Sequence, residues 1–372
     1  MSASHKKNKR NKRLGMVLLI EILVFVGLIL GYVWYYANHA LDQIVVDDTP
    51  KEEIDVSEAV TDTMQEKYTT IALFGLDTRG TVDMTKAGMA HSDAVIIACI
   101  NNETKEVKLA SVYRDCFLEM ANASADTQKF THAYFLGGPT CSVETLNRNL
   151  DLNITNYVSV DFEALTRAID ALGGVTINVK SNELENLNKN LTEQIEVTGI
   201  QSDGVWSAGE QTLNGSQATA YARIRKVGNN DFERTQRQRA VISAMVAKAK
   251  QSNLSTINNI IEEVFPLIAT NMSKKDMISM AANVFNYELG DNTGFPLANE
   301  TPTVGSKGSV VVPADLLSNV KHLHKFLYPD DTDYIPSSTV ENISARISSE
   351  TGIYDEFTDD KSTEEPTQTN SQ

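Results

Sequence analysis

Five arginines gather in one short segment of an otherwise acidic chain: Arg223, Arg225, Arg234, Arg237 and Arg239. Arg223 and Arg225 lie two residues apart, so in an extended segment both would point the same way. Asp231 is suited to cap the start of a helix, and Arg234 and Gln238 follow it at spacings that share one helical face. Guanidinium groups bind phosphate oxygens through paired hydrogen bonds, and a helix start adds favourable dipole potential. The segment predicts a phosphate clamp.

The alternative is a solvated helix face whose arginines pair with Glu210 and Glu233. The residues alone leave this alternative open. Five arginines in one segment of a chain with a net charge of −16 favour the clamp.

A second set of polar residues stands at the ends of predicted strands. Asp77 and Arg79 follow the first strand, Asp93 opens the next, and Arg114 closes the one after that. Strand ends are where sites are built on open sheets. Two carboxylates, together with phosphate oxygens, suit Mg²⁺ (or Mn²⁺). On the residues alone, each Asp could equally cap a turn.

Other catalytic or metal-binding patterns are missing from the sequence. It holds no Gly-x-Ser-x-Gly, His-Glu-x-x-His or Walker motif. His322 and His324 are two apart on a predicted helix, so they do not face each other and no metal site is predicted there. Cys99, Cys116 and Cys141 show no metal spacing, and their odd number excludes complete internal pairing. Cys116 and Cys141 could pair in an oxidising compartment.

Strand and helix patterns alternate through the middle of the chain. Strands are predicted at 70–74, 94–100, 107–112, 157–160, 175–179 and 309–312, with a hairpin-like turn at 101–105. Helices are predicted at 142–150, 162–172, 231–250, 256–269, 274–287 and 314–327. This order predicts an α/β fold, in which a central mixed sheet is covered by helices on both faces.

The amino-terminal region predicts a membrane anchor. Residues 14–37 are apolar except for Glu21, which is enough to span a bilayer. Residues 1–13 carry six lysines or arginines and no acid, which places them in the cytoplasm and the main body outside. A cleaved signal peptide is the alternative, but the stretch is long for one and no Ala-x-Ala site follows.

The rest of the chain divides by composition. Residues 38–67 are acidic and weakly periodic, and we expect an extracytoplasmic stalk. The folded domain is predicted at 68–334. Residues 345–372 are rich in Ser, Thr, Asp and Glu, and a disordered acidic tail is predicted there. A body this acidic is a poor partner for nucleic acid, so nucleic-acid binding is not expected.

The sequence resembles the LytR–CpsA–Psr family of Gram-positive cell-wall enzymes. Four blocks carry the resemblance: 73–79, then 92–94 with its hairpin to 114–115, then 160–175, and 213–239. The last block is the most specific, with its spacing of Gln217, Tyr221, Arg223, Arg225, Asp231, Arg234 and Gln238. Two positions depart from the family pattern: His91, where a basic residue is usual, and Thr131, where Asn is usual.

The resemblance implies an α-β-α sandwich with a hydrophobic cavity for a polyprenyl chain. It implies a phosphotransferase that moves a glycopolymer from a polyprenyl-pyrophosphate carrier to the muramic acid 6-hydroxyl of peptidoglycan. Carried over by position, Asp77 and Asp93 would hold the metal. Arg114, Arg223, Arg225, Arg234 and Gln238 would grip the pyrophosphate, and Asp231 would act as a base or orienting group. Arg79 is expected to join the substrate contacts.

The sequence leaves two other functions open. A polyprenyl-pyrophosphate hydrolase would use the same clamp with water as acceptor, and a non-catalytic scaffold would bind cell-wall lipids without reaction. The polymer, whether a teichoic acid, a capsule or another polysaccharide, is not specified by the residues.

Overall fold

The computed structural model describes residues 45–47, 51–60, 62–78, 83–122, 124–225, 227, 230–253, 256, 259–260, 263–283 and 285–354. The predicted anchor at 14–37 and the substrate contact Arg79 lie outside these residues. Within the described ranges, no helix combines the length and the apolar character needed to cross a membrane.

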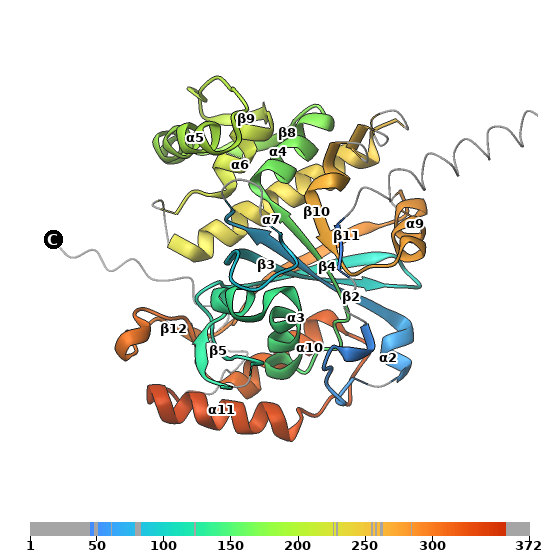
Figure 1. The fold of residues 1–372 in the computed structure, drawn as a ribbon, viewed down its shortest axis with the longest axis vertical. Coiled ribbons are helices and arrows are strands. Elements are labelled where there is room, and N and C mark those ends of the chain that lie inside the picture. The colour runs from blue at the N-terminus through green and yellow to red at the C-terminus, as the bar shows by residue number, and fades with distance from the viewer. Residues whose placement is uncertain are drawn as a thin grey trace, which may run out of the picture.

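A seven-stranded mixed sheet forms the centre of the molecule, as the alternation of elements predicts (Figure 1). In spatial order its strands are β1 (Val45–Val46), β10 (Ile268–Thr270), β7 (Asn156–Asp161), β2 (Tyr68–Leu76), β3 (Ser92–Asn101), β4 (Glu106–Val112) and β11 (Glu288–Phe295). The predicted hairpin of β3 and β4 is confirmed, because the two strands pair antiparallel. β2 pairs parallel with β7, which brings the carboxyl ends of these two strands together.

Both faces of the sheet are buried, which explains the continuous apolar runs of its strands. On β3, Val95, Ile97 and Cys99 enter the main core, whereas Ile96 and Ala98 enter a smaller cluster on the opposite face. Successive strand residues point to opposite faces, so a strand covered on both sides needs apolar residues at every position. The sheet can therefore hold one helical layer on each side.

One layer of helices and hairpins lies on each side of the sheet (Figure 1). The lower layer in that view holds α2 (Asp62–Lys67), α3 (Thr131–Leu150), α10 (Leu316–Leu327) and α11 (Ser338–Thr351), with the hairpins β5 (Phe117–Glu119)–β6 (Thr127–Lys129) and β12 (Asn299–Glu300)–β13 (Val312–Pro313). The upper layer holds α4 (Phe162–Ala171), α5 (Leu184–Thr198), α6 (Gly215–Ala222), α7 (Asn230–Lys250) and the hairpin β8 (Val175–Val179)–β9 (Gly209–Leu213). The remaining elements are α9 (Lys274–Ala282) and the short 3-10 turns Lys51–Glu53, Ser181–Glu183, Phe265–Leu267 and Gly305–Lys307.

Several elements differ from the sequence predictions. The helix predicted at 274–287 ends at Ala282, and only Val312 of the strand predicted at 309–312 lies in a strand. The helix predicted at 142–150 begins at Thr131, with non-helical backbone at Gly137 and Gly138 inside it. The end of the helix predicted at 256–269 is instead β10, which pairs with β7. The strand predicted at 175–179 is present as β8, but it pairs with β9 outside the central sheet. All three cysteines are buried free thiols, so the pairing considered for Cys116 and Cys141 is not formed.

The boundaries predicted for the folded domain were too narrow at both ends. Ile54, Val60 and Met64 of the supposed stalk are buried in the main core. The supposed tail from 345 begins inside α11, whose Ile343 and Ile347 are buried in the same core. Apolar residues at helical spacing need only one buried face, so the surrounding Ser and Glu residues do not exclude folding.

Replacing Ser337 by alanine is expected to lower the free energy of unfolding by about 1–2 kcal/mol, because Ser337 caps α11. Its Oγ accepts a hydrogen bond from Val340 N at 3.3 Å and donates one to Asp151 Oδ1 at 2.6 Å. Thermal unfolding followed by circular dichroism measures the change. Ser337→Asn, which retains a capping oxygen, is the control, and an unchanged melting temperature for Ser337→Ala would show that the Ser337 hydroxyl adds nothing to stability.

Candidate active site

A cavity of about 740 Å³ lies between the sheet and the upper helices. Most of its lining is apolar and comes from three sources: Leu73 and Ile96 on the sheet, Leu165 and Ala168 on α4, and Val241, Ile242, Met245 and Val246 on α7. Pockets of this size and character bind largely apolar ligands, and a few polar groups set the orientation. The polar groups here gather at one end of the cavity.

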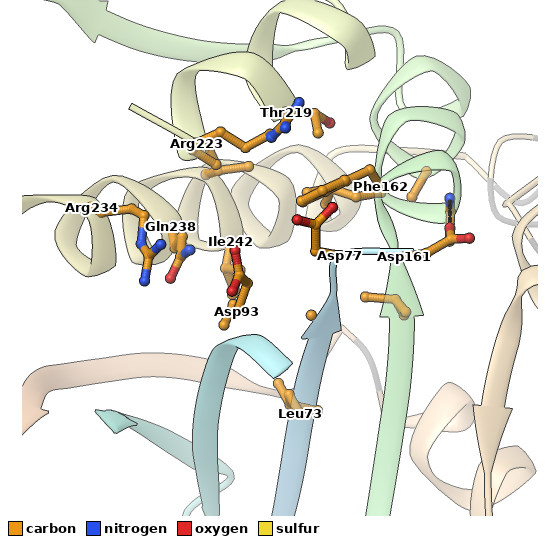
Figure 2. Close-up of a pocket in the computed structure, with 18 of the residues that line it drawn as sticks. Leu73, Asp77, Asp93, Asp161, Phe162, Thr219, Arg223, Arg234, Gln238 and Ile242 are labelled. Atoms are coloured by element: carbon orange, nitrogen blue, oxygen red, sulfur yellow. Dashed lines mark hydrogen bonds between the residues drawn. The ribbon is translucent and has the colours of Figure 1, made fainter. Parts of the chain in front are cut away.

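Helix α7 joins the polar end to the apolar end. Arg234, Gln238, Val241, Ile242 and Met245 all line the cavity, and their spacing places them on one helical face. Figure 2 shows Arg234 and Gln238 pointing from α7 toward Asp93, with Ile242 further along the same helix. The predicted shared face of Arg234 and Gln238 is therefore present. Asp231 is not the N-cap that was predicted, because α7 begins one residue earlier, at Asn230; the Asp231 side chain lies outside the described part of the structure.

Asp93 is the centre of the polar end. Its Oδ1 accepts a hydrogen bond from Arg114 Nη1 at 2.7 Å, and its Oδ2 accepts one from Arg225 Nη2 at 2.5 Å. Burial alone would raise the pKa of this carboxyl. The guanidiniums of Arg114, Arg225 and Arg234 outweigh burial and hold the pKa below its ordinary value. Asp93 is therefore ionised at neutral pH and keeps arginines of three different elements close together.

Arg223 is held in a different way from Arg225. Its guanidinium lies over the ring of Phe162, 4.5 Å from the centroid, and Nη1 donates to Gln194 Oε1 at 3.2 Å. Burial lowers the pKa of Arg223, and the charges of Asp77 and Glu193 oppose that change. Arg223 caps the carboxyl end of α6 in helical conformation, so the segment is not extended as the pairing of Arg223 and Arg225 had supposed. The two arginines nevertheless reach the same cavity.

Arg234 is the most buried member of the clamp, with only 2% of its surface exposed. Beside it, Gln238 has a buried side-chain oxygen with no hydrogen-bond partner among the described residues. A buried polar atom without a partner costs free energy, so its presence in a cavity wall favours a ligand that supplies the missing contact. Arg234 and Gln238 thus present hydrogen-bonding groups at the start of the apolar channel.

Arg114 was predicted to contact the pyrophosphate directly. It is not among the described residues that line the cavity, and it lies behind Asp93, with a second contact from its Nε to Asp115 at 3.4 Å. Arg237, inside the same arginine segment, faces away from the cavity and forms buried ion pairs with Glu183 and Glu233, both at 2.7 Å. Of the solvated-face alternative, only the partner Glu233 is found, and Arg237 pairs with it in a buried position, whereas Arg223, Arg225 and Arg234 line the cavity.

Sequence reasoning missed one wall of the site. Helix α5 turns a polar face to the cavity, made of Asn186, Lys189, Asn190 and Glu193. Glu193 lies 3.7 Å from Arg223, which connects this wall to the clamp. Polar residues at helical spacing look the same in sequence whether they face solvent or a cavity, so no signal in the sequence could have found them. Phe162, the ring beneath Arg223, was likewise not predicted.

Asp77 and Asp93 are the only carboxylates that the sequence offered for a metal ion, and both line the cavity. In the described ranges, no group of three or more His, Cys, Asp or Glu side chains is arranged to hold a metal. Mg²⁺ is commonly held by one or two carboxylates together with substrate phosphates. These two carboxylates therefore suit a metal ion that binds together with a phosphate ligand. They do not suit a metal ion that is held by protein side chains alone.

His91, one of the two departures from the family pattern, packs beside this site. Its ring stacks on Phe135 with centroids 4.9 Å apart and lies 5.3 Å from the ring of His132. The second departure, Thr131, donates its backbone N–H to the carbonyl of Arg114 at 2.8 Å. Both positions therefore support the backbone around Asp93 and Arg114 and do not line the cavity wall.

Comparison with known proteins shows which family the chain belongs to. It is 29% identical to the Bacillus subtilis polyisoprenyl-teichoic acid–peptidoglycan teichoic acid transferase TagV over 70% of this chain and 64% of that protein. It is 28% identical to B. subtilis TagT, a transferase of the same description, over 75% of this chain and 84% of that one. The crystal structure of gbs0355 from Streptococcus agalactiae matches with a TM-score of 0.61 and 25% identity, over 74% and 92% of the two chains. The profile of the LytR_cpsA_psr family matches residues 32–291. The chain belongs to the LytR_cpsA_psr family.

Proposed function

We propose that this protein transfers a glycopolymer from a polyprenyl-pyrophosphate carrier to the muramic acid 6-hydroxyl of peptidoglycan. The observation that carries the proposal is a single cavity with an apolar channel and an arginine-lined end, joined by one face of α7. A lipid pyrophosphate has the matching division into apolar chain and charged head. Family membership and the transferase activity of TagT and TagV support a teichoic acid as the polymer.

The proposed reaction is a phosphoryl transfer. The acceptor oxygen forms a bond to the phosphorus nearer the sugar, and the bond from that phosphorus to the bridging oxygen breaks. Lipid monophosphate leaves, the hydroxyl proton passes to a base, and a phosphodiester remains. Arg223, Arg225 and Arg234 would hold the pyrophosphate oxygens and stabilise their charge, because positioning and electrostatics supply most of the catalysis in such reactions.

The individual roles follow from the contacts of each residue. Arg223, Arg225, Arg234 and Gln238 all line the cavity, and Arg234 and Gln238 precede the apolar residues Val241, Ile242 and Met245 along α7. Arg114 would act mainly through Asp93, which it holds at 2.7 Å. Asp231, in the first turn of α7, and Arg79 stay as proposed contributors whose side chains lie outside the described residues.

Asp77 and Asp93 would hold Mg²⁺ (or Mn²⁺) when the donor is bound. A divalent cation there would neutralise phosphate charge as it develops. Because Asp93 already pairs with Arg114 and Arg225, donor phosphates must take over Arg225, which lines the cavity, before the carboxylate can turn to a cation. Metal and donor are therefore expected to bind together.

We also propose that the protein is anchored in the cell membrane by residues 14–37, with its cavity domain on the extracytoplasmic side. The apolar stretch and the basic residues before it support this topology. An anchored enzyme stays close to a carrier whose lipid is embedded in the same bilayer.

The test uses full-length protein in detergent micelles, a polyprenyl-pyrophosphate oligosaccharide, soluble peptidoglycan oligomers and varied Mg²⁺. We expect sugar to transfer only when metal is present. Asp77→Asn is expected to raise the Mg²⁺ concentration for half-maximal rate by at least about tenfold, as loss of metal contacts commonly does. Asp203→Asn, which changes a carboxylate outside the cavity lining, is the control.

Two other outcomes would contradict the transferase, and a third would contradict only its metal. Release of sugar phosphate without acceptor would identify a hydrolase. Tight lipid binding without any reaction would identify a scaffold. Full activity in excess chelator would remove the metal from the proposal while leaving the transferase intact.

A further inference from the structure

A second hollow opens at the amino-terminal end of α7, with a volume of about 540 Å³. It is lined by Phe232 of α7 and by Asn299, Glu300, Thr301 and Pro302 of the β12 hairpin. These last four residues follow the end of the family match at residue 291. Nothing in the proposed handling of the lipid donor uses this hollow.

Ring packing and backbone hydrogen bonds connect the hollow to the residues beside Arg114. The Phe232 ring packs edge-on against Tyr113, with centroids 4.5 Å apart, and Tyr113 directly precedes Arg114. On the other wall, Val311 N donates to Asp115 O and Phe117 N donates to Val311 O, both at 2.8 Å. The β12–β13 hairpin is therefore hydrogen-bonded to the backbone that follows Arg114. Asn319 fixes the base of the hairpin through hydrogen bonds with both backbone groups of Ala298, each at 3.0 Å.

Helix α7 gives the order of the two sites. Phe232 at the hollow comes first, Arg234 and Gln238 at the clamp follow, and Val241 and Met245 in the apolar channel come last. At about 1.5 Å of rise per residue, the hollow starts only about 3 Å before the clamp along the axis. Phe232 and Arg234 are two residues apart, so their side chains point to different faces of α7. The hollow therefore approaches the clamp through Tyr113 and the adjoining Arg114, which holds Asp93.

The lining of the hollow suits a sugar. An aromatic ring offers an apolar face, while the amide of Asn299, the carboxylate of Glu300 and the hydroxyl of Thr301 offer hydrogen-bonding partners for hydroxyl and acetamido groups. No cation lines the hollow among the described residues, whereas three arginines line the cavity, so the two sites select ligands of different charge.

We infer that this hollow is the acceptor subsite, where Phe232, Asn299, Glu300 and Thr301 bind an N-acetylated saccharide of the peptidoglycan strand. The inference rests on the proposed function and adds the place and the recognition residues of the second substrate. The acceptor would then lie beside Tyr113 and Arg114, next to the clamp that holds the donor.

The test measures acceptor and donor separately, with full-length protein in detergent micelles. Glu300→Gln and Phe232→Leu are each expected to raise the KM for soluble peptidoglycan oligomers by about tenfold, as loss of one good polar or packing contact does. The KM for the lipid donor is expected to stay within about twofold, since these residues do not line the cavity. Phe232→Leu keeps apolar packing against Tyr113, and Glu341→Gln on the exposed side of α11 is the matched carboxylate control.

A binding arm separates this inference from the proposed function. Calorimetry with an N-acetylated glycan oligomer, without donor, measures acceptor affinity even if the protein transfers nothing. Weaker glycan binding in Glu300→Gln and Phe232→Leu, and not in Glu341→Gln, would support the subsite whatever the transfer assay gives. Unchanged glycan affinity and unchanged acceptor KM in both variants would overturn it.

Discussion

Replacing Arg225 by alanine is expected to slow glycopolymer transfer by about 10²–10³-fold, the loss typical of removing one group that stabilises transition-state charge. Arg225 reaches Asp93 Oδ2 at 2.5 Å, and 43% of its side chain is exposed at the cavity mouth. An exposed ion pair contributes little to stability, so the melting temperature should barely change. The measurements are transfer rate at saturating substrates and thermal unfolding of the same samples.

The chain offers a matched control for this prediction. Buried Glu119 is paired with Arg148 at 2.7 Å and with Arg346, as Asp93 is paired with Arg114 and Arg225. Arg346 is about as exposed as Arg225, but it belongs to α11, on the other side of the sheet (Figure 1). Arg346→Ala should therefore leave transfer unchanged. Equal losses in both variants would mean that Arg225 acts through folding and not on the substrate.

Replacing Arg237 by alanine is expected to destabilise the fold by about 3–5 kcal/mol, because the buried carboxylate of Glu183 would lose its ion-pair partner. Glu183 is only 1% exposed and pairs with Arg237 Nε at 2.7 Å. Arg237 also donates to the carbonyls of Ile224 and Val227, at 3.2 and 3.3 Å. Those bonds hold the segment that bears Arg225, so the variant should lose transfer as well as stability. Thermal unfolding of the full-length protein measures the first effect.

A double variant separates charge from packing at this site. Arg237→Met with Glu183→Gln removes both charges and keeps similar volumes, so it should recover a large part of the stability that Arg237→Ala loses. Arg237→Ala melting at the temperature of the native protein would contradict the structural role and return Arg237 to the substrate contacts.

The contrast between Arg234 and Arg237 shows what the sequence could and could not predict. Helical spacing correctly grouped Arg234 with Gln238, since three- and four-residue separations place side chains on one face. The same rule would also group Arg237 with Arg234, three residues earlier, and nothing local shows that Arg237 instead pairs with Glu183, 54 residues earlier in the chain. Ion pairs across such separations depend on how helices dock, which periodicity does not specify.

The missed elements have similar causes. The run around β10 is apolar and short, so local preference does not distinguish a helix from a strand, and pairing with distant β7 decides it. The part of α11 from residue 345 was assigned to a disordered tail because residues 345–372 are rich in Ser, Thr, Asp and Glu. Three buried residues, Val340, Ile343 and Ile347, nevertheless attach the helix to the core. Composition averages over a helix, whereas packing depends on one face of it.

The pairing of Asp93 with two arginines has a consequence for turnover. Before the donor arrives, this carboxylate serves as an internal counter-ion, so the arginines lie together without a bound phosphate. A pyrophosphate has oxygens on two phosphates and can engage several guanidiniums at once. The lipid monophosphate left after transfer has one phosphate with which to engage them, so Asp93 can reclaim Arg225 from it. In the proposed reaction, the group that assembles the clamp also helps to expel the product.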